Sequence, residues 1–113
     1  MLTSAVSRNI SESDWKLFRQ LRPLALERFC QHVLGDIGRI AQDTGRTTHE
    51  RYRAIYDLVR HKDRVLADLF DDPRRSTALL QLRAIHSHGL LTEDEFARFS
   101  TKIRESVTWH DRI

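Results

Sequence analysis

The segment from Leu79 to Val107 carries start and stop signals for two helices, and these signals constrain the fold more than any other feature of the chain. Gly89 follows a helical pattern where a residue with positive φ lets the next amides return to the last carbonyl groups. Thr92 and Glu95 have the spacing of a capping box, in which each side chain accepts a hydrogen bond from the other residue's amide. The segment is therefore expected to form a helical hairpin.

The apolar residues of this hairpin recur every three or four positions, which places their side chains on one face of each helix. They are Leu79, Leu82 and Ile85 before the turn, and Phe96, Phe99, Ile103 and Val107 after it. Two such faces joined by a short turn can bury each other. Since Ser100 is also suited to cap a helix, the part after the turn is expected as one helix or as two.

Proline divides the first third of the chain. Residues 1–10 have no periodicity and are expected to form a flexible N-terminal arm. Ser11 then signals a first helix from about Glu12 to Arg22. Pro23 lacks an amide proton and clashes with the preceding turn, which costs about 3 kcal/mol inside a helix. A second helix is therefore expected from about Pro23 to Asp43, with one kinked helix as the alternative.

This second helix has the most regular apolar face of the chain and is expected at the centre of the core. The face consists of Leu26, Phe29, Cys30, Val33, Leu34, Ile37, Ile40 and Ala41. Gly35 and Gly38 interrupt the helix, and each costs up to about 1 kcal/mol relative to alanine. The expected reason for these two glycines is the close approach of another helix.

A second capping box, formed by Thr47 and Glu50, precedes a third helix from Thr48 to Phe70. Its apolar residues are expected to be buried, and they are Tyr52, Ile55, Tyr56, Val59, Leu66, Leu69 and Phe70. Residues 60–64 are all polar, so this turn is expected to project beyond the core or to face a polar group. Asp72 as the cap, with Pro73 after it, predicts a fourth helix that ends near His88.

Together these elements predict one all-α domain over residues 1–113, with five or six helices in an orthogonal or bundle-like arrangement and the hairpin at residues 79–107. The four glycines and two prolines are too few for a β fold with many turns. A single cysteine excludes an intrachain disulfide. The sequence has neither the apolar segment of a secretory signal nor a run of 18 apolar residues, so a cytoplasmic protein without a membrane segment is expected.

No residue pattern indicates catalysis, so a protein without enzymatic activity, cofactor or metal is expected. His86 and His88 point about 200° apart on a helix and cannot share an ion from one regular turn. With His110 they can still form a pH-sensitive patch across the hairpin. Cys30 lies on the most apolar face of the chain, where a thiol is usually inert.

A basic stripe suggests an alternative function. The net charge is +3, and Arg53, Arg60 and Arg64 fall on one side of the third helix, followed by Arg74 and Arg75. Such a stripe can lie along phosphates, as in a nucleic-acid-binding regulator. Acidic residues three or four positions from these arginines are expected to neutralise much of the field, and they are Asp57, Asp63 and Asp68. This favours a solvated surface.

The hairpin also resembles a known family. The sequence GLLTEDEF follows LxxLRAIHSH and precedes a helix with Phe99 and Ile103, and this pattern is similar to SHOCT, the short C-terminal domain of bacterial proteins. The matching residues are Leu79, Leu82, Gly89, Leu90, Leu91, Thr92, Glu93, Glu95 and Phe96. The resemblance implies a role in oligomerisation or as an adaptor, with nucleic-acid association as a looser suggestion.

The sequence therefore predicts a small bacterial-type helical interaction or regulatory module that associates with itself as a homodimer or with another protein. A nucleic-acid-binding regulator is the alternative, and an enzyme of unrecognised type is third. The candidate protein interface comprises two tryptophans near the chain ends, a residue type that leads in protein interfaces, and three residues of the hairpin. These residues are Trp15, Leu90, Leu91, Phe96 and Trp109.

Overall fold

The computed structural model describes residues 10–111, with side chains described through Thr108. The elements are α2 (Glu12–Ala41), α3 (Thr48–Phe70), the short 3-10 helix η1 (Arg75–Thr77), α4 (Ala78–Ser87), α5 (Glu93–Ala97) and α6 (Thr101–Asp111). No strand occurs within this range. The structure thus confirms the all-α class, and the division of the last segment at Ser100 produces α5 and α6. The flexible N-terminal segment expected at residues 1–10 lies almost wholly outside the described residues.

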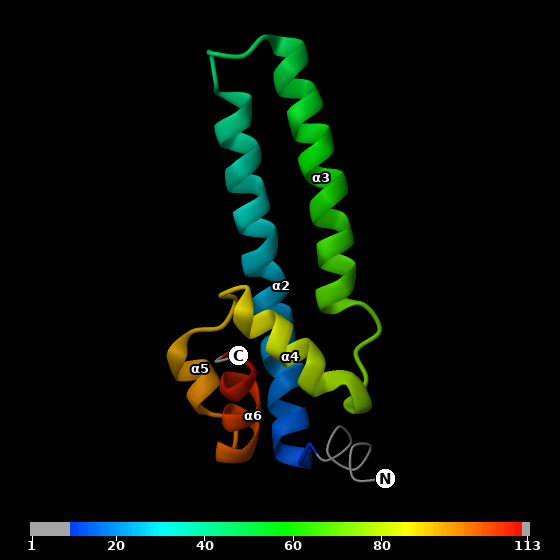
Figure 1. Ribbon diagram of the computed structural model, residues 1–113, viewed down its shortest axis with the longest axis vertical. Coiled ribbons are helices and arrows are strands. Elements are labelled where there is room, and N and C mark those ends of the chain that lie inside the picture. The colour runs from blue at the N-terminus through cyan, green and yellow to red at the C-terminus, as the bar shows by residue number, and fades with distance from the viewer. Residues whose placement is uncertain (1–9, 112–113) are drawn as a thin grey trace.

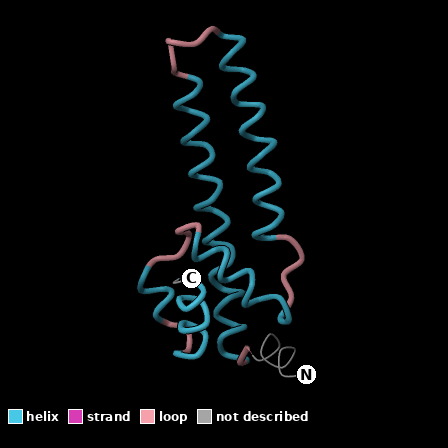
Figure 2. The backbone as a smooth tube through the Cα atoms, viewed as in Figure 1, coloured by secondary structure: helices cyan, strands magenta, loops and turns pink. Residues whose placement is uncertain are grey.

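Two long helices give the molecule its shape. α2 and α3 run antiparallel as a hairpin, while α4, α5 and α6 gather around the first half of α2 (Figure 1). Figure 2 shows that the turn between α2 and α3 lies at the far end from these shorter helices. The molecule measures 55 × 29 × 27 Å. We call residues 30–66 the arm and the rest of the described chain the base.

The core lies in the base. Every buried apolar side chain among the described residues belongs to it, and the largest of those that are fully buried are Phe18, Phe70, Leu69, Leu82, Ile85, Leu90 and Val107. Phe29 and Phe70 meet edge to face with their ring centroids 6.1 Å apart, at the level where the arm begins. None of the described helices is long and apolar enough to cross a bilayer.

Of the two alternatives predicted at Pro23, the break into two helices is wrong and the single helix is right, because α2 is one continuous helix with this proline inside it. The cost of the missing hydrogen bond is offset by packing on both sides of the proline. Leu21 and Ala25 are buried in the same core, and Arg22 donates a hydrogen bond to the carbonyl oxygen of Phe70. Tertiary contacts therefore hold together two segments that local propensity would separate.

The predicted burial of the α2 and α3 stripes is also wrong for most of their length. Of the α2 stripe only Phe29 is buried, and of the α3 stripe only Leu69 and Phe70. Leu34 is 66% exposed and Tyr52 is 65% exposed. Two helices alone cover one side of each other, so the arm leaves apolar residues in contact with water. The polar run at 60–64 belongs to this arm, which confirms that it projects beyond the core.

The two glycines of α2 have no other described helix packed closely against them. A Cβ atom at Gly38 would meet nothing within 4 Å, and one at Gly35 would meet only the Arg39 guanidinium at 3.8 Å. The predicted close approach of another helix of this chain is therefore wrong.

The start of the fourth helix is another correction, because α4 begins at Ala78 and not at Pro73. Asp72 adopts a φ of 51°, whereas an N-cap residue needs extended backbone. The chain turns at Asp72 and reaches α4 through η1. No side chain caps the start of η1 or the start of α4. Arg74 forms an ion pair with Asp72 at 2.8 Å across this turn.

The hairpin at residues 79–107 forms as predicted. Gly89 has a φ of 68°, and the amides of Gly89 and Leu90 donate to the carbonyl oxygens of His86 and Ile85 at 3.0 and 3.3 Å. These two bonds are those of a Schellman motif. The Thr92 hydroxyl accepts from the Glu95 amide at 3.1 Å, and the Glu95 carboxylate accepts from the Thr92 amide at 2.9 Å. The capping box is confirmed.

Two polar contacts attach the hairpin to α2, and the sequence did not predict them. Arg28 donates to both Glu95 carboxylate oxygens at 2.6 and 2.9 Å and to the Leu90 carbonyl oxygen at 2.9 Å. The buried Asp14 carboxylate accepts from the Ser100 amide at 2.9 Å and from the Ser100 hydroxyl at 2.6 Å. These contacts hold α5 and the start of α6 against α2.

Candidate functional site

The exposed apolar face of the arm is the most distinctive surface of the molecule. On α2 the stripe is Cys30, Leu34, Ile37 and Ala41, and on α3 it is Tyr52, Tyr56, Val59, Asp63 and Leu66. Both stripes follow alternating steps of four and three residues, so each keeps to one side of its helix. Helices with this spacing pack against partner helices of the same kind.

A groove of about 350 Å³ runs between the two stripes. Its lining is almost entirely apolar and comes from α2 and α3 alone, without any residue of the shorter helices. The lining residues are Phe29, Cys30, Val33, Leu34, Ile37, Val59, Lys62, Asp63 and Leu66. A partner can therefore reach the groove without displacing the base.

Contacts at both ends hold the arm in place, and where the arm begins these are the edge-to-face rings of Phe29 on α2 and Phe70 on α3. At the tip, the Arg51 guanidinium donates to the Ala41 carbonyl oxygen at 2.6 Å and so ties α3 to the end of α2. Thr47 and Glu50 form the predicted capping box at the start of α3. The hydrogen bond from the Thr47 amide to the Glu50 carboxylate lowers the pKa of Glu50. The groove is thus a fixed feature between two anchored helices.

Charges of both signs lie within and beside the apolar face. Asp63 is the one acidic residue in the α3 stripe, and Lys62 lines the same groove. The Arg60 guanidinium lies 5.6 Å from the centroid of the Tyr56 ring, in a cation–π contact. The face therefore combines apolar side chains with an acidic group and neighbouring cations.

The basic stripe of α3 is more available than the sequence suggested. Arg53, Arg60 and Arg64 are exposed, and no ion pair joins them to a carboxylate among the side chains described, which end at Thr108. The predicted neutralising pairs are thus absent from this part of the structure.

The two arginines beyond α3 are engaged with the protein itself. Arg74 pairs with Asp72. Arg75 pairs with Glu12 at 2.8 Å and donates to the Ile10 carbonyl oxygen at 3.0 and 3.3 Å. The structure therefore separates the candidate nucleic-acid contacts into a group on the arm without a carboxylate partner among the described side chains and a pair on the base that is engaged with the protein.

The four residues of the predicted protein interface whose side chains are described do not come together on one surface. Trp15 is half-buried and stacks on Phe18 with the ring centroids 5.9 Å apart. Leu90 is 1% exposed and belongs to the core, so the folded chain does not offer it to a partner. The side chain of Trp109 lies outside the described residues.

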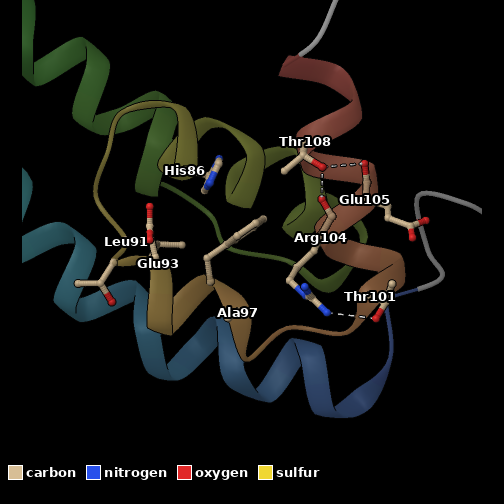
Figure 3. A pocket seen from close by; sticks show the side chains of 10 residues that line it. His86, Leu91, Glu93, Ala97, Thr101, Arg104, Glu105 and Thr108 are labelled. Atoms are coloured by element: carbon tan, nitrogen blue, oxygen red, sulfur yellow. Dashed lines mark hydrogen bonds between the residues drawn. The ribbon is translucent and has the colours of Figure 1, made fainter.

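Leu91 and Phe96 lie together at a second concavity, of about 460 Å³, between α5 and α6. Figure 3 shows Arg104 directed towards Thr101, to whose hydroxyl it donates at 3.1 Å, while Thr108 points back to its own helix. Arg104 also donates to the Phe99 carbonyl oxygen at 3.0 Å. These polar groups support the walls of the concavity.

Glu95 has the most strongly shifted carboxyl group among the described residues. The hydrogen bonds from Arg28 lower the pKa of Glu95 to about 2, with a further contribution from the Thr92 amide. The same pairing raises the pKa of Arg28. This is the electrostatics of a structural ion pair, because both groups are used in attaching the hairpin to α2.

Among the side chains that the structure describes, no group of three His, Cys, Asp or Glu residues is placed to hold a metal ion. Cys30 is half-buried in the wall of the arm groove, a more accessible position than the core site expected for it. The predicted histidine patch involves His110, whose side chain lies outside the described part of the chain.

The sequence missed the site because its members were assigned to the core. Leu34, Tyr56 and Val59 have the spacing of buried helix residues, and that spacing does not show what covers them. One signal was present in the sequence. The polar run at 60–64 lies between apolar turns of α3 and indicates that this part of the helix has little protein around it.

Comparison with known proteins gives no further information, since no family model, no curated protein and no solved structure matches this chain.

Proposed function

We propose that this protein is a helical interaction module, and that the apolar face of the arm is the surface with which it binds a partner, either a second copy of the chain or a different protein. The observation that carries the proposal is the exposure of large side chains on both arm helices. Leu34, Tyr52, Tyr56 and Val59 all have at least two fifths of their surface in contact with water.

The energetics of this surface support the proposal. Full burial of one leucine or valine side chain is worth about 1.5–3 kcal/mol. Contiguous apolar surface on a soluble protein often marks an interaction site, whereas isolated exposed residues need no explanation. Here the residues are contiguous, since Leu34 and Val59 line one groove. Tyrosine is also a residue type that contributes strongly at protein interfaces.

The design of the base fits the same function. It has its own closed core and attaches the hairpin of residues 79–107 through Arg28 and Asp14. A scaffold of this kind can present a rigid arm, which reduces the entropy lost on binding. The resemblance of the hairpin to SHOCT, which implies oligomerisation or an adaptor role, agrees with an interaction module.

Site-specific photocrosslinking in the cells from which the protein comes would test this proposal. Benzoylphenylalanine at position 34 is expected to give crosslinked adducts upon irradiation, because Leu34 lies in the proposed interface. Leu80 on α4 is a matched control, since it is 61% exposed but lies on the base. Benzoylphenylalanine at position 80 is expected to give few adducts.

Equal yields at the two positions, or adducts at position 80 alone, would contradict the proposal. The far-ultraviolet circular dichroism of both variants should match that of the unmodified protein, because each side chain replaced is already exposed to solvent. Repeating the experiment at Val59 gives a second position in the same groove, and it should reproduce the result at position 34.

A second candidate function is nucleic-acid binding by the arm. The observation that favours it is the exposed stripe of Arg53, Arg60 and Arg64 without carboxylate partners in the described residues. Each phosphate contact is expected to contribute about −0.9 to the slope of log K against log salt on B-DNA. Titration with mixed-sequence duplex DNA at two salt concentrations would test this. Absence of binding at low salt would exclude it.

A further inference from the structure

The size of the exposed face limits what can cover it. The free part of α2 is about 18 Å long and that of α3 about 28 Å, at 1.5 Å per residue. Two neighbouring helices together are roughly 20 Å wide. The face therefore offers roughly 500 Å² per molecule, or about 1,000 Å² for a pair, which reaches the lower limit of specific interfaces. A single partner helix would cover only about half of this face.

The charges on the face suit contact with an identical surface. In a twofold symmetric dimer the same patch meets itself, so a patch of one sign would repel its copy. Asp63 lies in the α3 stripe, and Lys62 lies beside it in the same groove. Arg60 and Arg64 are the neighbouring cations on the exposed side of α3. Each copy thus provides an acidic group and cations to meet the opposite charges of the other.

The helical spacing agrees with this arrangement. Four-helix bundles bury apolar positions that recur in steps of three and four residues. Leu34, Ile37 and Ala41 on α2 have these steps, and so do Tyr52, Tyr56 and Val59 on α3. The α3 stripe then continues through Asp63 to Leu66 with a step of four and a step of three. A single arm has two of the four helices of such a bundle, and a second arm placed face to face would supply the other two.

We propose that the partner of the arm is a second copy of this chain, and that two arms pack face to face as a four-helix bundle. This inference rests on the proposed function, because it names the occupant of the same surface. The groove of each copy is then filled by the stripes of the other, and Asp63 of one copy meets the cations of its partner.

Analytical ultracentrifugation of the full chain from 1 to 200 µM provides the first test. The expected result is a reversible monomer–dimer equilibrium that reaches twice the 13.3 kDa of one chain. Leu34→Glu is expected to raise the dissociation constant at least tenfold. Leu80→Glu is the matched control on the base and should leave it unchanged. A wild-type monomer at 200 µM, or a dimer insensitive to Leu34→Glu, would overturn the proposal.

A mixing experiment tests whether the two faces meet each other. One variant carries Asp63→Arg, and the other carries Arg60→Glu, Lys62→Glu and Arg64→Glu. Each variant alone should dimerise at least tenfold more weakly than the wild type, because its face has lost one sign of charge. The equimolar mixture should recover dimers, each with one copy of both variants. Failure of the mixture to associate more strongly than either variant would count against arm-to-arm contact.

These outcomes are separable from those of the proposed function. If the purified chain is monomeric while position 34 still crosslinks in cells to a protein of different mass, the arm is an interaction surface and only the second copy is wrong. If position 34 gives no adduct and the chain is monomeric, both proposals fail. Circular dichroism and the unfolding midpoint of each charged variant show that a loss of association does not arise from misfolding.

Discussion

The base and the arm are built from the same kind of amphipathic helix but have different surroundings. In the base, α2 is covered by the three shorter helices, and residues such as Phe18 and Leu82 are almost fully removed from water. In the arm, the same helix continues with the same spacing of apolar residues, but the groove beside its exposed stripe is lined by α2 and α3 alone. The comparison shows that apolar periodicity determines which side of a helix can be buried, whereas the neighbouring elements determine whether it is.

The difference predicts that equal substitutions have unequal effects in the two regions. Leu82→Ala removes a side chain that is 1% exposed in the base and should lower the free energy of unfolding by about 2–5 kcal/mol. Leu34→Ala removes the same atoms from the arm and should change it by less than about 0.5 kcal/mol in the monomer. Urea titration at a concentration where the chain is monomeric measures both values.

The measured effects of Leu34→Ala and Leu82→Ala can contradict this difference between the arm and the base. If Leu34→Ala destabilises the monomer as much as Leu82→Ala does, the arm has a core of its own and does not need a partner. If Leu34→Ala is silent for folding but weakens association, the apolar face of the arm contributes to binding. The second result is expected because Leu34 loses little surface to other residues of its own chain.

The parts of the fold that the sequence predicted depend on residues close together in the chain. Gly89, Thr92 and Glu95 interact within one or two helical turns, so their roles follow from residue type and spacing. The limits of α3 follow in the same way from its capping box. Local hydrogen bonds of this kind do not require knowledge of the rest of the molecule.

The parts that failed depend on contacts between distant residues. The continuity of α2 through Pro23 relies on a core to which α4 and α6 contribute, and the contact of Arg28 with Glu95 spans 67 positions. The exposed face of the arm could not be predicted because an apolar stripe looks the same whether its own chain or another molecule covers it. The candidate site was therefore assigned to the core.

Substitution of Asp14 tests how much its hydrogen bonds stabilise the base. Its carboxylate is buried and accepts hydrogen bonds from Ser11 and from the amide and hydroxyl of Ser100. Asp14→Ala would leave the Ser100 donors without this acceptor, which should lower the free energy of unfolding by about 2–3 kcal/mol. Ser13→Ala, one residue earlier and exposed, is the control and should be nearly silent. Comparable small losses for both would mean that this contact contributes little.

Two ion pairs sharpen the comparison between partly buried and exposed charges. Arg28 and Glu95 form a bidentate pair, and the Glu95 side chain is 15% exposed. Glu95→Gln should lower the free energy of unfolding at pH 7 by about 1–3 kcal/mol. Glu12 pairs with Arg75 but is 71% exposed, so Glu12→Gln should cost less than about 1 kcal/mol.

The shifted pKa of Glu95 predicts in which direction its contribution to the free energy of unfolding changes with pH. The folded-state pKa of Glu95, about 2, lies below its ordinary value of 4.5. Its contribution to stability is therefore fully present above about pH 4.5 and is lost as the pH falls towards 2. The difference between wild type and Glu95→Gln should shrink over this interval in urea titrations. A difference independent of pH would show that the ionised carboxylate is not what stabilises the hairpin.

Glycine-to-alanine substitutions provide the smallest and most specific test, because they should have opposite signs in the two regions. Gly89 in the base has a φ of 68°, and a side chain there is strained whatever the surrounding space. Gly89→Ala should therefore destabilise the monomer by about 1 kcal/mol or more. Gly38 in the arm lies inside α2, and a Cβ atom there meets nothing within 4 Å. Gly38→Ala should stabilise the monomer by about 0.5–1 kcal/mol, because alanine loses less backbone entropy in a helix.

The two glycine variants also separate folding from association. A methyl group at Gly89 cannot affect the arm directly, so Gly89→Ala should leave the dissociation constant of a dimer unchanged when the chain is folded. Gly38 is half-buried beside the exposed stripe of α2. If Gly38→Ala stabilises the monomer but weakens association, the glycine serves close packing against the second copy. If Gly38→Ala both stabilises the monomer and strengthens association, Gly38 only lowers the stability of the helix, and the interface lies on the side of Leu34 alone.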